Sequence, residues 1–367
     1  MTQGFFLDLG EIGDTSRKNK LDRVNTAGRI IKGCAACSMD NHCRRPKMEP
    51  YGNGTLKIMI VGEAPGATED EIGRPFVGKA GKFLRDAFEE FGIDVDEHCI
   101  VTNVIQCRPP HNEFPKDPEI VENCITRLYE QIDKFQPKLI FACGTHAVTA
   151  VLKPPFPVTM EKMRGFTIPS RRFNCWVSCI QHPSYIMRRD GQNSKKEEFA
   201  AEDARKVWVR DIASGLEYLE EPVPQPLDPK GYRILRTMKE VREYFQFLME
   251  KQVPTAIDYE TNTVDVFREE IDLLSIAFST DPSEGVFLPL TFKNLWSEDE
   301  LLEIFALLVE FLESDCEKII QNSDYERNVS KIALGAEING PVWDTMIVNH
   351  ILDERKDING MEFMIFK

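Results

Sequence analysis

The sequence predicts two successive α/β domains, each built on a β-sheet covered by helices. In both halves of the chain, apolar runs of strand length alternate with longer stretches whose apolar residues recur at helical spacing. Between the halves, four prolines fall within residues 222–229, a density that favours an extended spacer over a helix. The predicted order is an N-terminal extension over 1–30, a first domain over 31–219, a proline-rich linker over 220–230 and a second domain over 231–367.

Four apolar runs in the first domain are predicted to form a parallel sheet with helices on both faces. They cover residues 56–61, 99–105, 138–143 and 175–180. In such sheets the loops that follow the carboxyl ends of the strands carry the chemistry. Here these loops hold Glu63, the segment around Cys107, and His182.

Helices are predicted between these strands. Over residues 79–91, apolar side chains at helical spacing, among them Leu84 and Ala87, share one face. A second helix begins at Asp117-Pro118, which supplies a capping carboxylate and a proline at the first helical position. Cys124 lies within this second helix.

The second domain repeats the alternation of strands and helices. Helices are predicted over residues 237–251, 300–312 and 344–352, and strands over 254–260, 273–279, 286–290 and 318–321. The helix over 300–312 is strongly apolar.

The net negative charge of the chain comes from the second domain. The net charge of −15 comes from 45 basic and 60 acidic side chains. Residues 1–220 hold 31 of each kind, so the remaining 147 residues, with 14 basic and 29 acidic side chains, carry the whole imbalance. An acidic domain can still act on DNA if divalent metal ions occupy its carboxylates.

The composition argues against a membrane protein and against an exported one. No apolar run of about 18 residues occurs, and residues 1–20 lack the apolar core of a signal peptide. We therefore expect a cytoplasmic protein with no membrane contact. In a reducing cytosol, ten cysteines are better explained by a metal site than by a disulfide framework.

Four of the cysteines form two pairs. Two residues separate Cys34 from Cys37, and sixteen separate Cys107 from Cys124. Two thiolate pairs brought together by the fold would supply a four-thiolate metal site. The alternative is four unrelated buried thiols, which are common in protein cores.

Four motifs of the first domain resemble those of the family 4 iron–sulfur uracil-DNA glycosylases, and they follow one another in the family's order over about residues 30–215. They are Gly62-Glu-Ala-Pro-Gly66, Gly73-Arg-Pro-Phe-Val-Gly78-x-Ala-Gly81, Thr102-Asn-Val-Ile-Gln-Cys-Arg-Pro-Pro110 and His182-Pro-Ser-Tyr185. The resemblance implies a uracil-DNA glycosylase-like fold. It also implies a [4Fe–4S] cluster held by Cys34, Cys37, Cys107 and Cys124, with Cys43 as a further thiol that can replace one of the first pair.

The resemblance further implies a role for each motif. Phe76 would stack under a flipped uracil, and the amide of Asn103 would match the acceptor–donor edge of the base. His182 would hydrogen-bond the negative charge that develops on the departing base. Glu63 would position or activate water, or stabilise the cationic sugar. The other substrate-binding residues that the motifs imply are Gly62, Pro65, Gly66, Ser184 and Arg188.

Two other interpretations of this domain are rejected. The segment from Gly73 to Ala80 nearly matches a phosphate-binding P-loop, but Ala80 lacks the hydroxyl that would hold Mg²⁺ and no strand precedes the segment. Some relatives bond covalently to DNA through a basic loop ending in histidine. Residues 108–115 contain His111 but no basic run, so we expect no covalent capture. The residues after Gly66 match the glycosylase family only in part. The motifs therefore predict the fold more strongly than they predict which base the domain removes.

In the second domain, Asp258 and Glu260 lie on one side of a predicted strand, because side chains alternate along a strand. Paired carboxylates suit a two-metal site for phosphodiester hydrolysis, and the alternative is a solvated strand end. With residues 320–327 and 342–346, they resemble the 3′–5′ exonuclease domain of family A DNA polymerases. This resemblance implies an RNase-H-like fold, Mg²⁺ or Mn²⁺ at Asp258 and Glu260, and substrate contact by Asn322.

The second domain departs from that family in two ways. The acid of the second motif, four residues after Asn322, is Glu326 instead of aspartate, and Asp324 is the alternative ligand. A third motif, Tyr-x3-Asp, is expected beyond Asp344 and does not occur before Lys367. We therefore expect an incomplete exonuclease domain and little or no nuclease activity.

The combination of the two domains resembles the N-terminal part of the DNA polymerases of some large bacterial viruses. It implies DNA as partner, single-stranded or uracil-containing and with 3′ ends, together with the replication machinery in the host cytoplasm. The leading hypothesis is an active glycosylase joined to proofreading machinery. One alternative is a non-catalytic iron–sulfur module that binds DNA and senses uracil. Another is a free-standing nuclease, against which the missing third motif argues.

Overall fold

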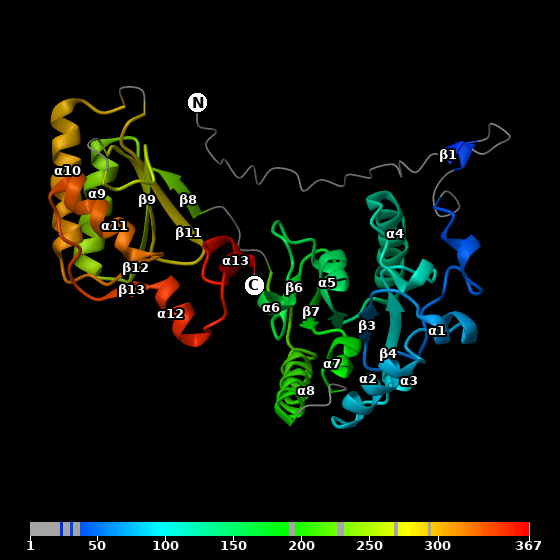
Figure 1. Cartoon of the computed structure of the whole chain (residues 1–367). Coiled ribbons are helices and arrows are strands. Elements are labelled where there is room, and N and C mark those ends of the chain that lie inside the picture. The colour runs from blue at the N-terminus through cyan, green and yellow to red at the C-terminus, as the bar shows by residue number, and fades with distance from the viewer. Residues whose placement is uncertain are drawn as a thin grey trace. The chain divides into compact units, whose positions relative to one another are not determined.

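The computed structural model describes residues 23–24, 30–31, 37–190, 195–225, 231–267, 271–292 and 295–366 (Figure 1). Cys34, residues 226–230 of the proline-rich linker and most of the N-terminal extension lie outside the described residues. Within the extension, β1 (Arg23–Val24) pairs with β2 (Ile30–Ile31). The chain divides into two compact units, Met1–Pro224 and Gln225–Phe366.

The first unit contains a five-stranded sheet in the order β4-β3-β5-β7-β6. Four strands are parallel, as predicted: β3 (Ile58–Gly62), β4 (Cys99–Asn103), β5 (Leu139–Cys143) and β7 (Cys175–Ile180). The edge strand β6 (Thr167–Ser170) runs antiparallel to β7 and was not predicted. Its Pro169 suggests a loop, but proline is tolerated in edge strands.

Helices cover both faces of this sheet, since every residue of β3, β5 and β7 is buried. One face packs against α2 (Lys79–Glu89) and α8 (Lys195–Leu216), whose Leu84, Phe88 and Trp208 share a core with Ile58 and Phe141. The longer helices of this unit also include α4 (Pro118–Phe135) and α5 (Thr145–Leu152). Short elements complete it: η2 (Met39–His42), α1 (Ala67–Ile72), α3 (Val95–His98), η3 (Pro110–Asn112), α6 (Met160–Met163) and α7 (Pro183–Asp190).

The start of α4 follows the capping rule that predicted it. The Asp117 side chain accepts the backbone N–H of Glu119, and Pro118 occupies the first helical position. This cap places Cys124 in the second turn, where its side chain is buried.

The second unit contains a six-stranded mixed sheet in the order β13-β12-β9-β10-β11-β8. Its strands are β8 (Gly231–Ile234), β9 (Thr255–Thr261), β10 (Leu273–Ser279), β11 (Glu284–Pro289), β12 (Lys318–Ile320) and β13 (Val342–Asp344). β9, β10 and β11 are antiparallel neighbours, whereas β12 and β8 join the sheet in parallel.

One face of this sheet is buried under α9 (Met238–Lys251) and α10 (Glu298–Glu313). Phe245, Phe278 and Phe311 meet there in edge-to-face contacts. Both helices begin with a capping box, as the Thr237/Glu240 pair shows for α9. The remaining helices are α11 (Ser323–Val329), η4 (Ser330–Leu334), α12 (Thr345–Leu352) and α13 (Met361–Phe366). Within the part of the chain that is described, no helix is long and apolar enough to cross a membrane.

Candidate active sites of the two domains

In the first unit, Gly62 and Asn103 are directly paired at the carboxyl ends of β3 and β4. A Cβ atom on Gly62 would lie 2.5 Å from Oδ1 of Asn103 and 2.5 Å from the ring of Phe76. Only glycine therefore allows the Phe76 ring and the Asn103 amide to converge on this strand end. Phe76 and Asn103 retain 5% and 4% of their exposure, so they form the floor of the site.

The backbone of Phe76 is held in an unfavourable conformation. Its φ of 55° lies in the left-handed region, which costs a bulky residue about 1–3 kcal/mol. The Phe76 carbonyl accepts a hydrogen bond from Nη1 of Arg85 and lies where a Cβ on Gly81 would clash, 1.7 Å away. Strain that neighbouring groups maintain in this way is typical of functional sites.

His182 follows β7 and faces the same floor, with its ring centroid 6.1 Å from that of Phe76. Its Nδ1 accepts the backbone N–H of Ser184 at 3.3 Å and lies 2.7 Å from the Ser184 hydroxyl. Burial, with the charge of Arg188, lowers the pKa of His182 to about 4. At neutral pH the imidazole is therefore uncharged, and because Nδ1 accepts, the proton resides on Nε2.

Glu63 directly follows the carboxyl end of β3 and lies beside the loop that follows β4. The backbone N–H groups of Val104 and Ile105 donate to the carbonyls of Gly62 and Glu63, both at 2.9 Å, so the two loops are joined. Among the described residues, no hydrogen bond or ion pair engages the Glu63 carboxylate, which leaves it available to substrate or water.

Gly66 and Pro65 shape the turn after Glu63. Pro65 is buried. The carboxylate of Glu69 braces the turn, because its Oε1 accepts the N–H of Gly78 at 2.7 Å and its Oε2 would lie 2.7 Å from a Cβ on Gly66. The predicted Ser184 and Arg188 lie on α7, where Nη1 of Arg188 donates to the Ser184 hydroxyl at 3.4 Å.

Three of the four cysteines predicted to hold a cluster, and the alternative Cys43, lie among the described residues. Cys37, Cys107 and Cys124 are buried, and Cys43 is partly buried. The Sγ of Cys107 accepts the backbone N–H of Lys47 at 3.2 Å. The Cys43 thiol lies within hydrogen-bonding distance of Cys107. Cysteine sulfurs with backbone N–H partners suit an iron–sulfur cluster, whose potential depends on such bonds.

Two further contacts tie the cysteine segments together, and neither was predicted. The buried carboxylate of Asp70 accepts the N–H groups of Arg44 and Arg45, at 3.1 and 2.9 Å. The buried side chain of Gln106 places its Nε2 3.4 Å from the carbonyls of both Asn103 and Cys124. The contacts of Asp70 with Arg44 and Arg45, and of Gln106 with Cys124, join residues far apart in sequence, so the local pattern gives no signal for them.

In the second unit, Asp258 and Glu260 point to the exposed side of β9, as strand alternation predicted. Burial and the charge of Glu260 raise the pKa of Asp258. Glu326, on α11, is 3% exposed, and its pKa rises to about 7 through burial and the nearby charges of Asp258 and Asp344. Its Oε2 has no hydrogen-bond partner among the described residues.

Asp344 organises this region and was not predicted as a site residue. It caps α12, and its two oxygens also accept the N–H groups of Asn322 at 3.3 Å and Ser323 at 2.6 Å. This fixes the start of α11, so that Glu326 faces Asp258 while Asp324 is exposed. Across the described residues, no three Asp, Glu, His or Cys side chains already lie close enough to hold one metal ion.

Comparison with protein families assigns each unit separately. Residues 49–205 match the model described as the uracil DNA glycosylase superfamily. Residues 232–367 match the model described as a 3′–5′ exonuclease, of the DNA polymerase A type.

Individual relatives agree with these matches. The type-4 uracil-DNA glycosylase of Sulfurisphaera tokodaii is 48% identical over 198 residues, which are 53% of this chain and 86% of that protein. The type-4 uracil-DNA glycosylase of Pyrobaculum aerophilum is 41% identical over 34% of this chain and 62% of its own length.

A third relative spans both units. The DNA polymerase of Bacillus phage SP01 is 25% identical over 334 residues, which are 84% of this chain but only 34% of that polymerase. Among solved structures, Brucella melitensis NrnC with bound Mg²⁺ is similar to 35% of this chain and 55% of its own, at 20% identity and a TM-score of 0.25.

Proposed function

The chain belongs, through its first domain, to the type-4 uracil-DNA glycosylase family, and we propose that this domain hydrolyses the N-glycosidic bond of a flipped uracil in DNA. The family and fold predicted from the motifs are confirmed, as is the 3′–5′ exonuclease domain that follows. The observation that carries the proposal is the convergence of Phe76, Asn103 and His182 beside Gly62.

Phe76 and Asn103, which form the floor of the site, would recognise uracil. The Phe76 ring offers a face for stacking, and the Asn103 amide offers one acceptor and two donors to the edge of the base. Both side chains are buried and tightly packed against Gly62, so they are pre-organised and lose little entropy when the base enters.

His182 would assist departure of the base as a neutral hydrogen-bond donor. Its pKa of about 4 keeps the ring uncharged at neutral pH, and its Nδ1 is already occupied by Ser184. The free Nε2–H can then donate to the uracil oxygen on which negative charge develops as the glycosidic bond breaks. Arg188, through Ser184, would hold the histidine loop and contact a phosphate.

Glu63 would act on the deoxyribose and on the attacking water. Its carboxylate stands at the end of β3 with no partner among the described residues, where it can orient an attacking water and stabilise positive charge on the sugar. The turn braced by Pro65, Gly66 and Glu69 fixes its position.

The cysteines have the chemistry of an iron–sulfur site, although no three of the described ones already lie close enough to share one metal ion. We propose Cys34, Cys37, Cys107 and Cys124 as its ligands, with Cys43 as the alternative to one of the first pair. When bound, a [4Fe–4S] cluster would supply a structural link between the N-terminal segment and the β4 loop, not chemistry on the base. The loop it would hold is the one that follows Asn103 at the end of β4.

The second domain would act at DNA 3′ ends. The unpartnered Oε2 of Glu326 near Asp258 is an acceptor that a cation would satisfy, so Asp258, Glu260 and Glu326 fit Mg²⁺ or Mn²⁺. A bound divalent ion would activate water and neutralise charge on the phosphate. Asn322, at the start of α11, would contact the strand. Since no three such side chains of the described residues already lie close enough to hold one ion, weak activity is expected for this domain by itself.

The two domains together support a role in phage-type DNA replication. We propose that the chain corresponds to the N-terminal part of such a polymerase, with the host replication machinery as partner and the host cytoplasm as its location. Removal of uracil ahead of synthesis and trimming of 3′ ends would then be joined in one polypeptide.

The glycosylase proposal is tested with the purified chain, single-stranded DNA carrying one uracil, and EDTA to silence the exonuclease. We expect free uracil and an abasic site, both lost in Asn103→Ala. Tight binding of uracil-DNA without release of the base would favour the alternative, a non-catalytic uracil-sensing module. An unaltered rate in Asn103→Ala would reject the proposed site.

A further inference from the structure

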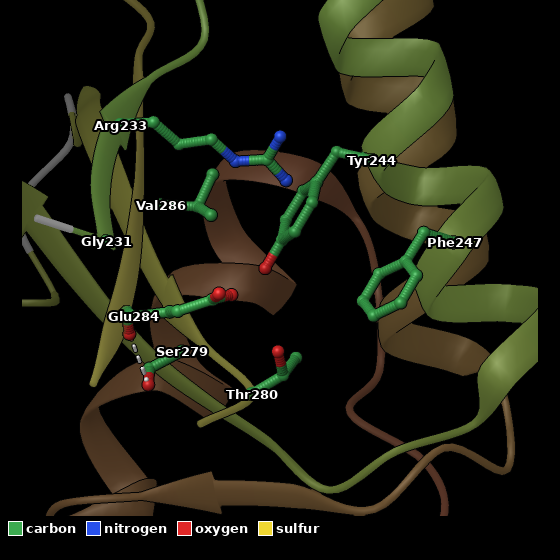
Figure 2. A pocket seen from close by; sticks show the side chains of 8 residues that line it. All are labelled: Gly231, Arg233, Tyr244, Phe247, Ser279, Thr280, Glu284 and Val286. Atoms are coloured by element: carbon green, nitrogen blue, oxygen red, sulfur yellow. Dashed lines mark hydrogen bonds between the residues drawn. The ribbon is translucent and has the colours of Figure 1, made fainter. Parts of the chain in front are cut away.

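A cavity of about 320 Å³ opens in the second unit between α9 and the strands β8, β10 and β11 (Figure 2). Its strand residues Arg233 and Val286 are paired in register and face α9. Asp258 belongs to the opposite face, because it pairs with Ala277, which in turn pairs with Phe287, the neighbour along β11 of the cavity residue Val286. The cavity is therefore separate from the carboxylates of the exonuclease site.

The cavity contains a buried hydroxyl with no partner. Tyr244 is only 3% exposed, and its OH makes no hydrogen bond within the described part of the chain. Figure 2 shows this hydroxyl directed into the cavity, toward the side where Glu284 and Thr280 lie. A buried unsatisfied hydroxyl costs about 1–3 kcal/mol, so a ligand that pairs with it gains that energy.

The positively charged side chain of Arg233 lies beside Tyr244. The Arg233 guanidinium stands over the Tyr244 ring, 5.2 Å from the centroid. It is exposed, and no carboxylate of the described residues forms an ion pair with it. A guanidinium that stands on an aromatic face and makes no ion pair is well placed to take a phosphate or carboxylate, although its charge also acts on the Glu240 carboxylate.

Phe247, on the same helix as Tyr244, adds a flat apolar ring to the cavity, and polar side chains lie across from it. Phe247 lies nearly parallel to Tyr244, with ring centroids 6.3 Å apart and planes at 23°, and is 38% exposed. Opposite it are the Glu284 carboxylate and the Thr280 hydroxyl. The nearby Ser279 hydroxyl is already bonded to the carbonyls of Asp281 and Glu284, so it is not free for a ligand.

We propose that this cavity binds a purine nucleoside monophosphate unit. The base would stack on Phe247 and donate its amino hydrogens to Glu284, the phosphate would pair with Arg233, and the Tyr244 hydroxyl would donate to a ligand oxygen or ring nitrogen. A carboxylate, a cation and an exposed ring in one cavity match a ligand that is planar, anionic at one end and a donor at the other. The volume suits one nucleotide.

The nucleotide unit has two sources, a free mononucleotide or one residue of a DNA strand. Titration of the full chain with dGMP, dAMP, deoxyguanosine and a purine tetranucleotide, by calorimetry in EDTA, separates them. We expect dGMP or dAMP to bind at least about tenfold more tightly than the deoxynucleoside, because the Arg233–phosphate pair is lost in the latter. A tetranucleotide that binds at least about tenfold more tightly than the mononucleotide identifies the strand as the source.

Variants link binding to the cavity. Arg233→Gln and Phe247→Ala should each weaken dGMP or dAMP binding about tenfold or more, whereas Arg236→Gln, on an exposed neighbour outside the cavity, should not. Tyr244→Phe should raise the melting temperature of the ligand-free chain, since it removes an unsatisfied hydroxyl, yet reduce the further rise on adding nucleotide. Absence of binding, or binding equal in Arg233→Gln and wild type, would overturn the proposal.

Discussion

The side-chain amide of Gln106 lies 3.4 Å from the carbonyl of Asn103 and 3.4 Å from the carbonyl of Cys124. One buried side chain therefore joins the strand end that would read the base to the helix that would hold a cluster ligand. Since the backbone carbonyl of Gln106 also accepts the N–H of Met48 at 2.7 Å, the segment after Cys43 is tied to the same point.

Gln106→Leu should loosen base recognition while the cluster is retained. The variant keeps the side-chain volume but loses both hydrogen bonds, so we expect KM for uracil-DNA to rise about fivefold to tenfold with a smaller change in kcat. Iron content and steady-state kinetics are measured together. Gln131→Leu, which removes another amide near β4, is the matched control, and equal KM values in both variants would contradict this role.

Gly62→Ala should abolish most glycosylase activity without unfolding the chain. The added methyl group would lie 2.5 Å from both the Phe76 ring and the Asn103 amide, so these groups must move apart. A displacement of about 1 Å at such a site costs roughly a hundredfold in kcat/KM. Gly360→Ala, where a Cβ meets nothing within 4 Å, is the control. Full activity in Gly62→Ala would show that the close packing is not required.

Acid should destabilise the first domain through His182. Its pKa of about 4 in the folded protein is below the ordinary value of 6.5, so the unfolded chain binds the proton more readily. The free energy of unfolding is then fully maintained above pH 6.5 and falls by on the order of 2 kcal/mol as pH drops toward 4. Urea unfolding at several pH values tests this, and His182→Gln should lose that part of the pH dependence.

Metal binding to the second domain should strengthen as pH rises. The pKa of Glu326 is about 7 and that of Asp258 is raised, so the metal-free site holds protons that a cation must displace. Between pH 6 and pH 7, affinity for Mn²⁺ should rise by up to about tenfold. Calorimetric titration measures this, and Glu326→Gln should flatten the profile. A slope that persists in Glu326→Gln would assign the proton to another group.

The cysteine ligands are distinguished by iron content. Cys107→Ala and Cys124→Ala should each reduce iron content and the visible absorbance of the cluster, because each removes one of the four proposed thiolate ligands. Cys37→Ala and Cys43→Ala decide which thiol completes the N-terminal pair. If both keep full iron, neither completes the set as proposed. Cys316→Ala, in the second unit, is the control.

Local signals predicted much of the fold. The bounds of β7 and β10 match the predicted runs, since continuous apolar runs between turn residues identify buried strands. The Asp117 cap and Pro118 marked the start of α4 for the same local reason. The antiparallel edge strand β6 was missed because its proline reads as a break, and its pairing with β7 is a tertiary contact.

Contacts between side chains on different elements could not be predicted from the sequence. The motifs named Phe76 and Asn103, but not the left-handed backbone of Phe76 or its dependence on Gly81. Asp344 was noticed only as part of a motif, although it holds the start of α11. The Arg233–Tyr244 stack joins a strand to a helix, and no periodicity in either element signals such a contact.

The Asp70 carboxylate has a consequence for how the proposed cluster would assemble. Because it accepts two backbone N–H groups just after Cys43, the segment bearing that thiol is anchored to α1 by protein contacts alone. Loss of the proposed cluster would then leave this segment on α1, so the chain would keep Cys43 in place for a second round of assembly.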